Sequence, residues 1–145
     1  MSLDLSVSAE LIEIPGNGYM LFGTTELDMG QLAVSNFTSL VASLRSLKEL
    51  HLDSVDLSQS ADWCDALSMY TPNLRVLRLP FCGVSGPICG TLSALHSLSA
   101  IDLQYNSLTG PVPDFFANYS FLGVLQLSYN YLRGWVSLKI FELKN

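Results

Sequence analysis

Positively charged side chains are few in this sequence. It holds 7 Lys and Arg against 13 Asp and Glu, which gives a formal net charge of -6. Proteins bind nucleic acids and anionic membranes mainly through Lys and Arg side chains that neutralise phosphates. The composition therefore argues against both of these partners and favours a protein or peptide.

Long apolar runs are also missing. No stretch approaches the roughly eighteen continuous apolar residues that a membrane helix needs. The segment Met1–Glu10 lacks the basic region and the apolar core of a signal peptide. We therefore expect no signal peptide and no transmembrane segment in this chain.

Residues that bind metals or perform catalysis are sparse. Cys64, Cys82 and Cys89 are too few for a small disulfide-rich fold, and their spacing matches no zinc motif. The two histidines, His51 and His96, have no serine motif beside them, and no glycine-rich phosphate loop is present. The sequence predicts no metal, no cofactor and no enzymatic activity.

Apolar residues, in contrast, are abundant. They make up 49% of the 145 residues, whereas charged residues make up 14%. Disordered chains show the opposite combination of low hydrophobicity and high charge. The length suits one ordered domain with a sizeable core.

A leucine pattern repeats along the chain. Ile101 recurs as Leu125 at a shift of 24 residues, and as Leu77 at the same shift in the other direction. In each unit two apolar residues alternate with polar neighbours, which is typical of a strand with one buried face, so the strands are expected to stack in parallel. We expect a single domain over 1–145, uncapped at both ends, with six strands near residues 3–5, 27–29, 50–52, 77–79, 101–103 and 125–127.

A polar position follows each of the later strands. Cys82, Asn106 and Asn130 stand where the chain turns away, and a side-chain amide there can satisfy backbone groups of adjacent coils. The glycines and prolines that follow favour turns over long helices. The side opposite the sheet is therefore expected to contain short helical turns and irregular coil.

The pattern from Leu95 to Pro113, with Gly110 as a landmark, resembles the plant-specific class of leucine-rich repeats. The segments Asp62–Leu67 and Pro72–Leu77 look like plant receptor-like proteins of the disease-resistance type. This resemblance implies an α/β fold: a leucine-rich-repeat solenoid, part of a curved horseshoe. A parallel β-sheet would line the concave face, and 3-10 or irregular structure the convex face.

The same resemblance carries an expectation about biology. Members of that family are cell-surface glycoproteins that sense peptides or proteins outside the cell and signal through partner receptor kinases. The resemblance thus implies a protein or peptide ligand, a co-receptor kinase, and the extracellular side of the plasma membrane for the parent receptor. Because a signal peptide and an anchor are missing from the sequence, we expect a fragment of a larger receptor.

Residues one repeat apart should form columns on the concave face. The column between the strand leucines starts with Asp4 and Asp28, and a second column holds an aromatic ladder. Two alternatives stay open: the aromatic rings stack only on one another, and the charged residues form surface ion pairs. The candidate ligand contacts are Phe81, Tyr105, Tyr129, Arg78, Asp102, Gln126 and His51.

Two kinds of covalent modification are also indicated. The sequons at Asn36 and Asn118 are candidate glycosylation sites. Cys64 and Cys89 lie on comparable stretches of successive coils, so a disulfide between them is a hypothesis, and Cys82 is expected to be a buried packing residue.

The sequence therefore predicts an extracellular recognition scaffold that takes part in plant defence or development signalling and performs no chemistry. Two alternatives remain open. One is a secreted leucine-rich-repeat inhibitor of microbial cell-wall-degrading enzymes, which would need a full set of repeats and both caps. The other is a truncated product without an independent function.

Overall fold

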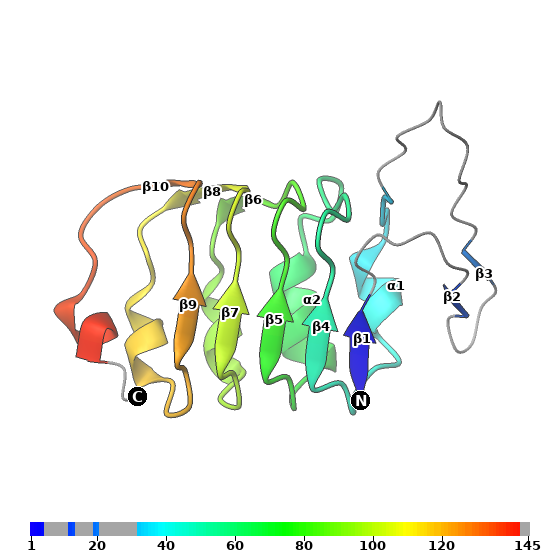
Figure 1. Cartoon of the computed structure of the whole chain (residues 1–145), viewed down its shortest axis with the longest axis horizontal. Helices are drawn as coiled ribbons and strands as arrows, with labels where there is room; N and C mark the ends of the chain where they lie inside the picture. The colour runs from blue at the N-terminus through cyan, green and yellow to red at the C-terminus, as the bar shows by residue number, and fades with distance from the viewer. Residues whose placement is uncertain (5–11, 14–18, 21–31, 143–145) are drawn as a thin grey trace.

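The computed structural model describes residues 1–4, 12–13, 19–20 and 32–142. Its main feature is a five-stranded sheet with the order β1-β4-β5-β7-β9, in which every pairing is parallel. Figure 1 shows these strands side by side, with helices behind them. The strands are β1 Ser2–Asp4, β4 Glu49–His51, β5 Val76–Arg78, β7 Ala100–Asp102 and β9 Val124–Gln126.

The strands share one register. Leu77 pairs with Leu50 on one side and with Ile101 on the other. Ile101 pairs in turn with Leu125. The parallel stacking expected from the repeat is present, and it brings the equally spaced apolar residues into one interior.

The first strand departs from the expected order. β1 pairs directly with β4, and Asp4 lies opposite His51. β1 thus occupies the place next to β4 that the repeat period assigned to 27–29 and to Asp28, residues that lie outside the described ranges. The repeat period predicts how far apart strands lie in the sequence. It does not predict which strand takes the place next to β4 in the sheet.

Residues 32–48 complete the coil that β1 begins. Ala33 forms a parallel bridge with Asp56, and the Val34 N–H donates to the Asp56 carbonyl at 2.9 Å. Helix α1 (Phe37–Val41) then packs against the helix of the next coil, and the chain continues into β4. The strand and the convex part of this coil therefore come from segments far apart in the sequence.

A second, smaller sheet runs along the side of the solenoid. It has the order β10-β8-β6 and parallel pairing, with β6 Ser85–Pro87, β8 Ser107–Gly110 and β10 Tyr131–Leu132. Gly86, Gly110 and Gly134 adopt φ values of 79°, 76° and 96°, in the region that glycine enters most easily. The glycines and prolines of these segments predicted turns, and the pairing into a second sheet was not predicted from the sequence.

The convex side carries helices of two kinds. The first two coils have the α-helices α1 and α2, and the later coils have short 3-10 helices, as expected. A separate antiparallel pair joins β2 (Ile12–Glu13) and β3 (Tyr19–Met20). The convex helices after α1 are α2 Trp63–Tyr70, η1 Gly90–Ala94, η2 Asp114–Asn118 and η3 Leu138–Glu142.

The core lies between the main sheet and these helices. Leu50, Leu77 and Ile101 are fully buried, and so are the residues two positions later in each strand segment. Burial of one such side chain contributes about 1.5–3 kcal/mol relative to exposure. Each coil contributes only a few of these buried side chains and cannot cover them by itself. The stability of a coil therefore depends on the neighbouring coils that stack against it.

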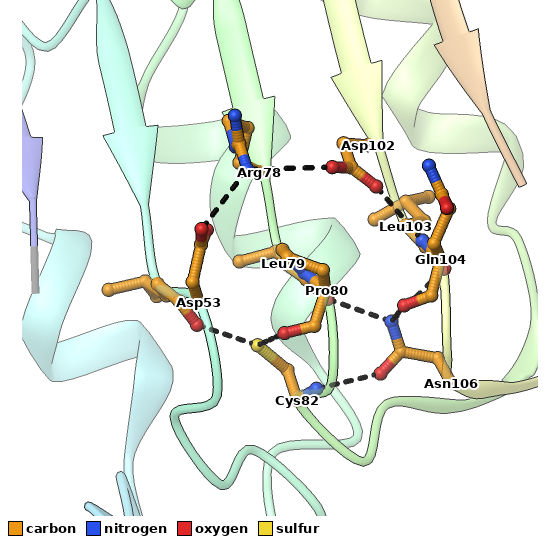
Figure 2. A network of polar contacts seen from close by, with 10 residues as sticks. Asp53, Arg78, Leu79, Pro80, Cys82, Asp102, Leu103, Gln104 and Asn106 are labelled. Atoms are coloured by element: carbon orange, nitrogen blue, oxygen red, sulfur yellow. Dashed lines mark hydrogen bonds and ion pairs between the residues drawn. The ribbon is translucent and has the colours of Figure 1, made fainter. Parts of the chain in front are cut away.

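Asn106 ties the backbones of two successive coils together (Figure 2). Its Oδ1 accepts hydrogen bonds from the N–H groups of Cys82 and Val84 at 3.0 and 3.2 Å. Its Nδ2 donates to the carbonyls of Leu79 and Leu103 at 2.7 and 3.1 Å, and to that of Gln104. Asn130 repeats the arrangement one coil later, with its Oδ1 accepting from Leu108 N–H at 3.0 Å.

Cys82 occupies the equivalent position in the preceding coil. Its thiol donates to the Leu52 carbonyl at 2.8 Å and lies 3.3 Å from the Pro80 carbonyl. The side chain is fully buried, and desolvation raises the pKa of the thiol to about 12. Cys82 is thus a neutral packing residue that also satisfies one buried carbonyl.

Cys64 and Cys89 form a disulfide on the convex side, with a Cα–Cα distance of 6.1 Å. It links α2 to the residue that precedes η1, and so joins two successive coils. Disulfides persist in oxidising compartments. This bond therefore suits an extracellular protein.

Candidate ligand-binding face

The exposed face of the main sheet presents one column of side chains between its leucines. The register places His51 beside Arg78, and Arg78 beside Asp102. Asp102 is followed by Gln126. The sheet thus brings together the four candidate contacts that the repeat had placed in this column, with Asp4 next to His51.

Three aromatic rings form a continuous stack just beyond the strands. The Phe81 and Tyr105 ring centroids are 4.2 Å apart and nearly parallel, at 8°. Tyr105 and Tyr129 repeat the same distance and angle. We call Phe81, Tyr105 and Tyr129 the aromatic stack.

Backbone geometry holds the stack in place. Phe81, Tyr105 and Tyr129 have φ values of 56°, 55° and 57°, in the left-handed region that large residues rarely enter. Hydrogen bonds to the next coil secure this conformation: the Phe81 N–H donates to the Gln104 carbonyl at 3.2 Å, and the Tyr105 N–H to Ser128 at 3.1 Å. The strained turn aims each ring along the face of the solenoid.

The rings are held together but are not covered. Phe81, Tyr105 and Tyr129 are 52%, 40% and 69% exposed. Desolvation, and then a hydrogen bond with Tyr129, raises the pKa of Tyr105, so this hydroxyl stays neutral at physiological pH. The stack therefore offers a rigid, uncharged surface with hydroxyl groups at one end.

A charged cluster of Asp53, Arg78 and Asp102 lies at the carboxyl ends of β4, β5 and β7, and Figure 2 shows this cluster from close by. Arg78 Nη2 is 3.1 Å from Asp53 Oδ2 and 3.8 Å from Asp102 Oδ2. The Asp102 Oδ1 accepts a hydrogen bond from the Gln104 N–H. The sequence suggested that the charged residues of the column form surface ion pairs, but it did not indicate Asp53, which makes the closer contact with Arg78.

Asp53 could have been found from its place directly after Leu52, at the end of a strand beside Arg78. The contact itself depends on side-chain reach across coils, which a repeat pattern does not specify. Two buried atoms of this cluster, Asp53 Oδ1 and Arg78 Nε, have no hydrogen-bond partner among the described residues. The cluster is thus compact and carries one excess negative charge.

The remaining candidates are simpler. His51 Nε2 lies 3.6 Å from Glu49 Oε2 within the same strand. Gln126 is exposed at the end of the column. The sequon residues Asn36 and Asn118 are exposed on convex elements, where Asn36 also caps α1 by accepting from Ser39 N–H at 2.9 Å. Glycans at these positions would leave the concave face open.

In the described part of the chain, no group of three or more His, Cys, Asp or Glu side chains is arranged to hold a metal ion. Among the described helices, none has the length and apolarity to cross a bilayer.

Comparison with known proteins matches these features. The family model described as Leucine Rich Repeat matches residues 97–119. One similar solved structure is the ectodomain of the Arabidopsis receptor kinase HAESA in complex with an N-terminally extended IDA peptide hormone, with 28% identity and a TM-score of 0.56. Another is the BIR3–SERK2 complex from Arabidopsis thaliana, with 26% identity and a TM-score of 0.64.

The chain is a leucine-rich-repeat solenoid. The α/β fold class that the resemblance to plant leucine-rich repeats implied is confirmed. The matches cover 70% and 77% of this chain but only 17% and 58% of the matched chains, respectively. The leucine-rich-repeat solenoid thus resembles plant receptor ectodomains over most of its length, while spanning a part of each.

Proposed function

We propose that this solenoid recognises a protein or peptide ligand on its concave face, as part of a plant cell-surface receptor-like protein of the disease-resistance type. The observation that carries the proposal is the aromatic stack, which is exposed and rigid beside a charged cluster. Defence or development signalling is the process in which such a receptor would act.

The stack suits a binding role because its side chains are already ordered in the free protein. Phe81, Tyr105 and Tyr129 are held by ring contacts and by inter-coil hydrogen bonds before any ligand arrives. Rigid aromatic side chains lose little conformational entropy on binding and are enriched at interface hot spots. A ligand segment lying along the stack would cover all three rings.

The charged cluster would orient a bound ligand. Arg78 lies between Asp53 and Asp102, so a ligand guanidinium or ammonium group is attracted by the carboxylates. Gln126 and His51 offer further polar contacts within the column. A peptide that combines an apolar segment with a basic side chain fits this arrangement.

Similar structures support the proposal. The HAESA ectodomain was solved with a peptide hormone, and BIR3 was solved in complex with SERK2. By analogy we propose a co-receptor kinase as a second partner of the parent receptor. The Cys64–Cys89 disulfide and the exposed sequons support an extracellular location.

Selection of peptides from a displayed random library against the leucine-rich-repeat solenoid tests the proposal. Peptides that bind should lose at least about tenfold in affinity with Tyr105→Ala or Tyr129→Ala, since hot-spot truncation costs about 2 kcal/mol or more. Phe141→Ala is the matched control, because Phe141 is 74% exposed but lies in η3 on the convex side.

Two results would count against the proposal. Selected peptides whose binding is unaffected by every stack variant would show that the concave face is not the binding surface. The second result is that the same residues bind microbial cell-wall-degrading enzymes while no peptide binds. That result would favour the alternative function, a secreted inhibitor of those enzymes.

A further inference from the structure

Basic residues gather on an edge of the sheet that the concave-face proposal does not use. The loops that lead into the strands run along one edge, the lower one in Figure 1. Arg45 and Lys48 precede β4, and Arg75 precedes β5. All three side chains are exposed. We call Arg45, Lys48 and Arg75 the basic rim.

Hydrogen bonds to backbone carbonyls hold these loops side by side. The Arg75 N–H donates to the Lys48 carbonyl at 2.7 Å, and Asn73 Nδ2 donates to the Arg45 carbonyl at 3.2 Å. Ser99 Oγ continues the series by donating to the Arg75 carbonyl at 3.0 Å. Three cations therefore project from two adjacent coils of one rigid edge.

The charges on the basic rim contrast with those of the whole chain. The net charge of the chain is -6, yet three of the chain's 7 Lys and Arg residues belong to the basic rim. Ion pairs within the described ranges join Glu49 to His51 and Arg78 to two aspartates, and none of them includes a residue of the basic rim. Like charges on adjacent coils repel one another, and an anionic partner would relieve that repulsion.

A surface hollow of about 310 Å³ adjoins the basic rim. It is lined by Arg75, Ser97, Ser99 and Phe121. Phe121 is 70% exposed, although it is a large apolar residue. This volume is near the lower limit of about 300 Å³ for ligand pockets, so it suits one or two side chains of a partner.

We propose that the basic rim and this hollow bind an acidic segment of a protein partner. Asp or Glu carboxylates of the partner would contact Arg45, Lys48 and Arg75, and an adjacent apolar side chain would enter the hollow against Phe121. The hollow combines the Phe121 ring with the Arg75 guanidinium and the hydroxyls of Ser97 and Ser99. This combination favours a peptide segment with both acidic and apolar side chains over a purely anionic chain.

The position of this surface gives it a role distinct from ligand recognition. The basic rim lies at the start of the strands, whereas the aromatic stack lies beyond their ends. A peptide on the stack and an acidic partner at the basic rim can therefore be bound at the same time. The solenoid would then join a ligand to a second protein.

The test measures binding of a fluorescein-labelled peptide of alternating glutamate and leucine to the full chain by fluorescence anisotropy. Lys48→Glu/Arg75→Glu should weaken binding at least about tenfold, and Phe121→Ser several-fold. Binding should also weaken as salt is raised. A peptide with glutamine in place of glutamate should bind at least about tenfold more weakly.

Arg133→Glu/Lys139→Glu is the matched control, because it changes the net charge equally at exposed positions outside the basic rim. Equal weakening by this variant would overturn the proposal, since binding would then follow net charge alone. Unchanged binding by Lys48→Glu/Arg75→Glu would overturn it too. So would Arg75-dependent binding of dextran sulfate without peptide binding, which would indicate a polysaccharide. Melting curves that match those of the parent chain verify that each variant is folded.

Discussion

The coils around β4 and β5 and the coils around β7 and β9 share one leucine interior but are closed on the outside in different ways. The earlier pair carries the eight-residue helix α2 and the Cys64–Cys89 disulfide. The later pair carries the 3-10 helices η2 and η3, the side-sheet strands β8 and β10, and the two asparagines. One sheet register thus accommodates two arrangements of the convex side, because the paired leucine positions that face the interior are shared.

The two pairs of coils are stabilised by different interactions. In the earlier coils a covalent link and helix packing restrain the convex side. In the later coils, buried amides satisfy backbone groups that water cannot reach. The predictions below weaken one region at a time, from the largest expected effect to the smallest.

Asn106→Leu should have the largest effect, in the later coils. It removes five hydrogen bonds and leaves backbone donors and acceptors buried without partners. We expect the free energy of unfolding to fall by about 3–5 kcal/mol in urea denaturation. Asn73→Ala, at an exposed amide with one bond, is the control and should change it by about 0.5 kcal/mol or less. An equal loss from both variants would contradict the importance of burial.

Removing the disulfide should weaken the earlier coils. Cys64 and Cys89 close a loop with a sequence separation of 25, for which chain entropy predicts a contribution of about 3 kcal/mol. Cys64→Ser/Cys89→Ser should lower the melting temperature, as should a reducing agent added to the parent chain. The reducing agent should leave the double variant unchanged; a further drop would point to another reducible bond.

Alkaline pH should act through Cys82. Burial raises the pKa of this thiol from 9.0 to about 12, so the unfolded chain loses the proton first. The contribution is complete below about pH 9 and is lost as pH rises from 9 towards 12, by about 1–2 kcal/mol near pH 10. Urea denaturation across this range measures the loss. Cys82→Ala should flatten the pH dependence, and an unchanged slope would assign it to other groups, such as Tyr119.

The smallest effect concerns the left-handed turn. Ser54 has φ of 64°, in the same position as Phe81 one coil later, but it has no ring to stack. Ser54→Gly should stabilise the chain by a few tenths of a kcal/mol because strain is removed at the cost of chain entropy. Ser128→Gly, at a position outside the positive-φ set, should be destabilising. Thermal melts compare the two variants, and equal signs would refute the strain argument.

Several particular features were predictable from residue spacing. Leu77, Ile101 and Leu125 recur at one interval and lie in adjoining strands. The column of Phe81, Tyr105 and Tyr129 follows from the same interval, since equal spacing on equal coils stacks equal positions. Local geometry repeats because each coil meets the same neighbours.

Other features were not predictable, because they depend on where separate segments meet. The pairing of β1 with β4 required the chain to return at Ala33, and the contact of Arg78 with Asp53 required a particular side-chain reach. The side sheet also depends on backbone pairing between β6, β8 and β10, for which no side-chain pattern was recognised.

The order of residues therefore settled the repeat length, the buried rows and the faces on which the aromatic and polar columns lie, because these follow from the two-residue period of a strand and the length of a coil. Folding in three dimensions settled which coil β1 joins, which carboxylate binds Arg78 and how the basic rim assembles. Those outcomes depend on contacts between coils, and their energies belong to pairs of distant residues and not to any one stretch of sequence.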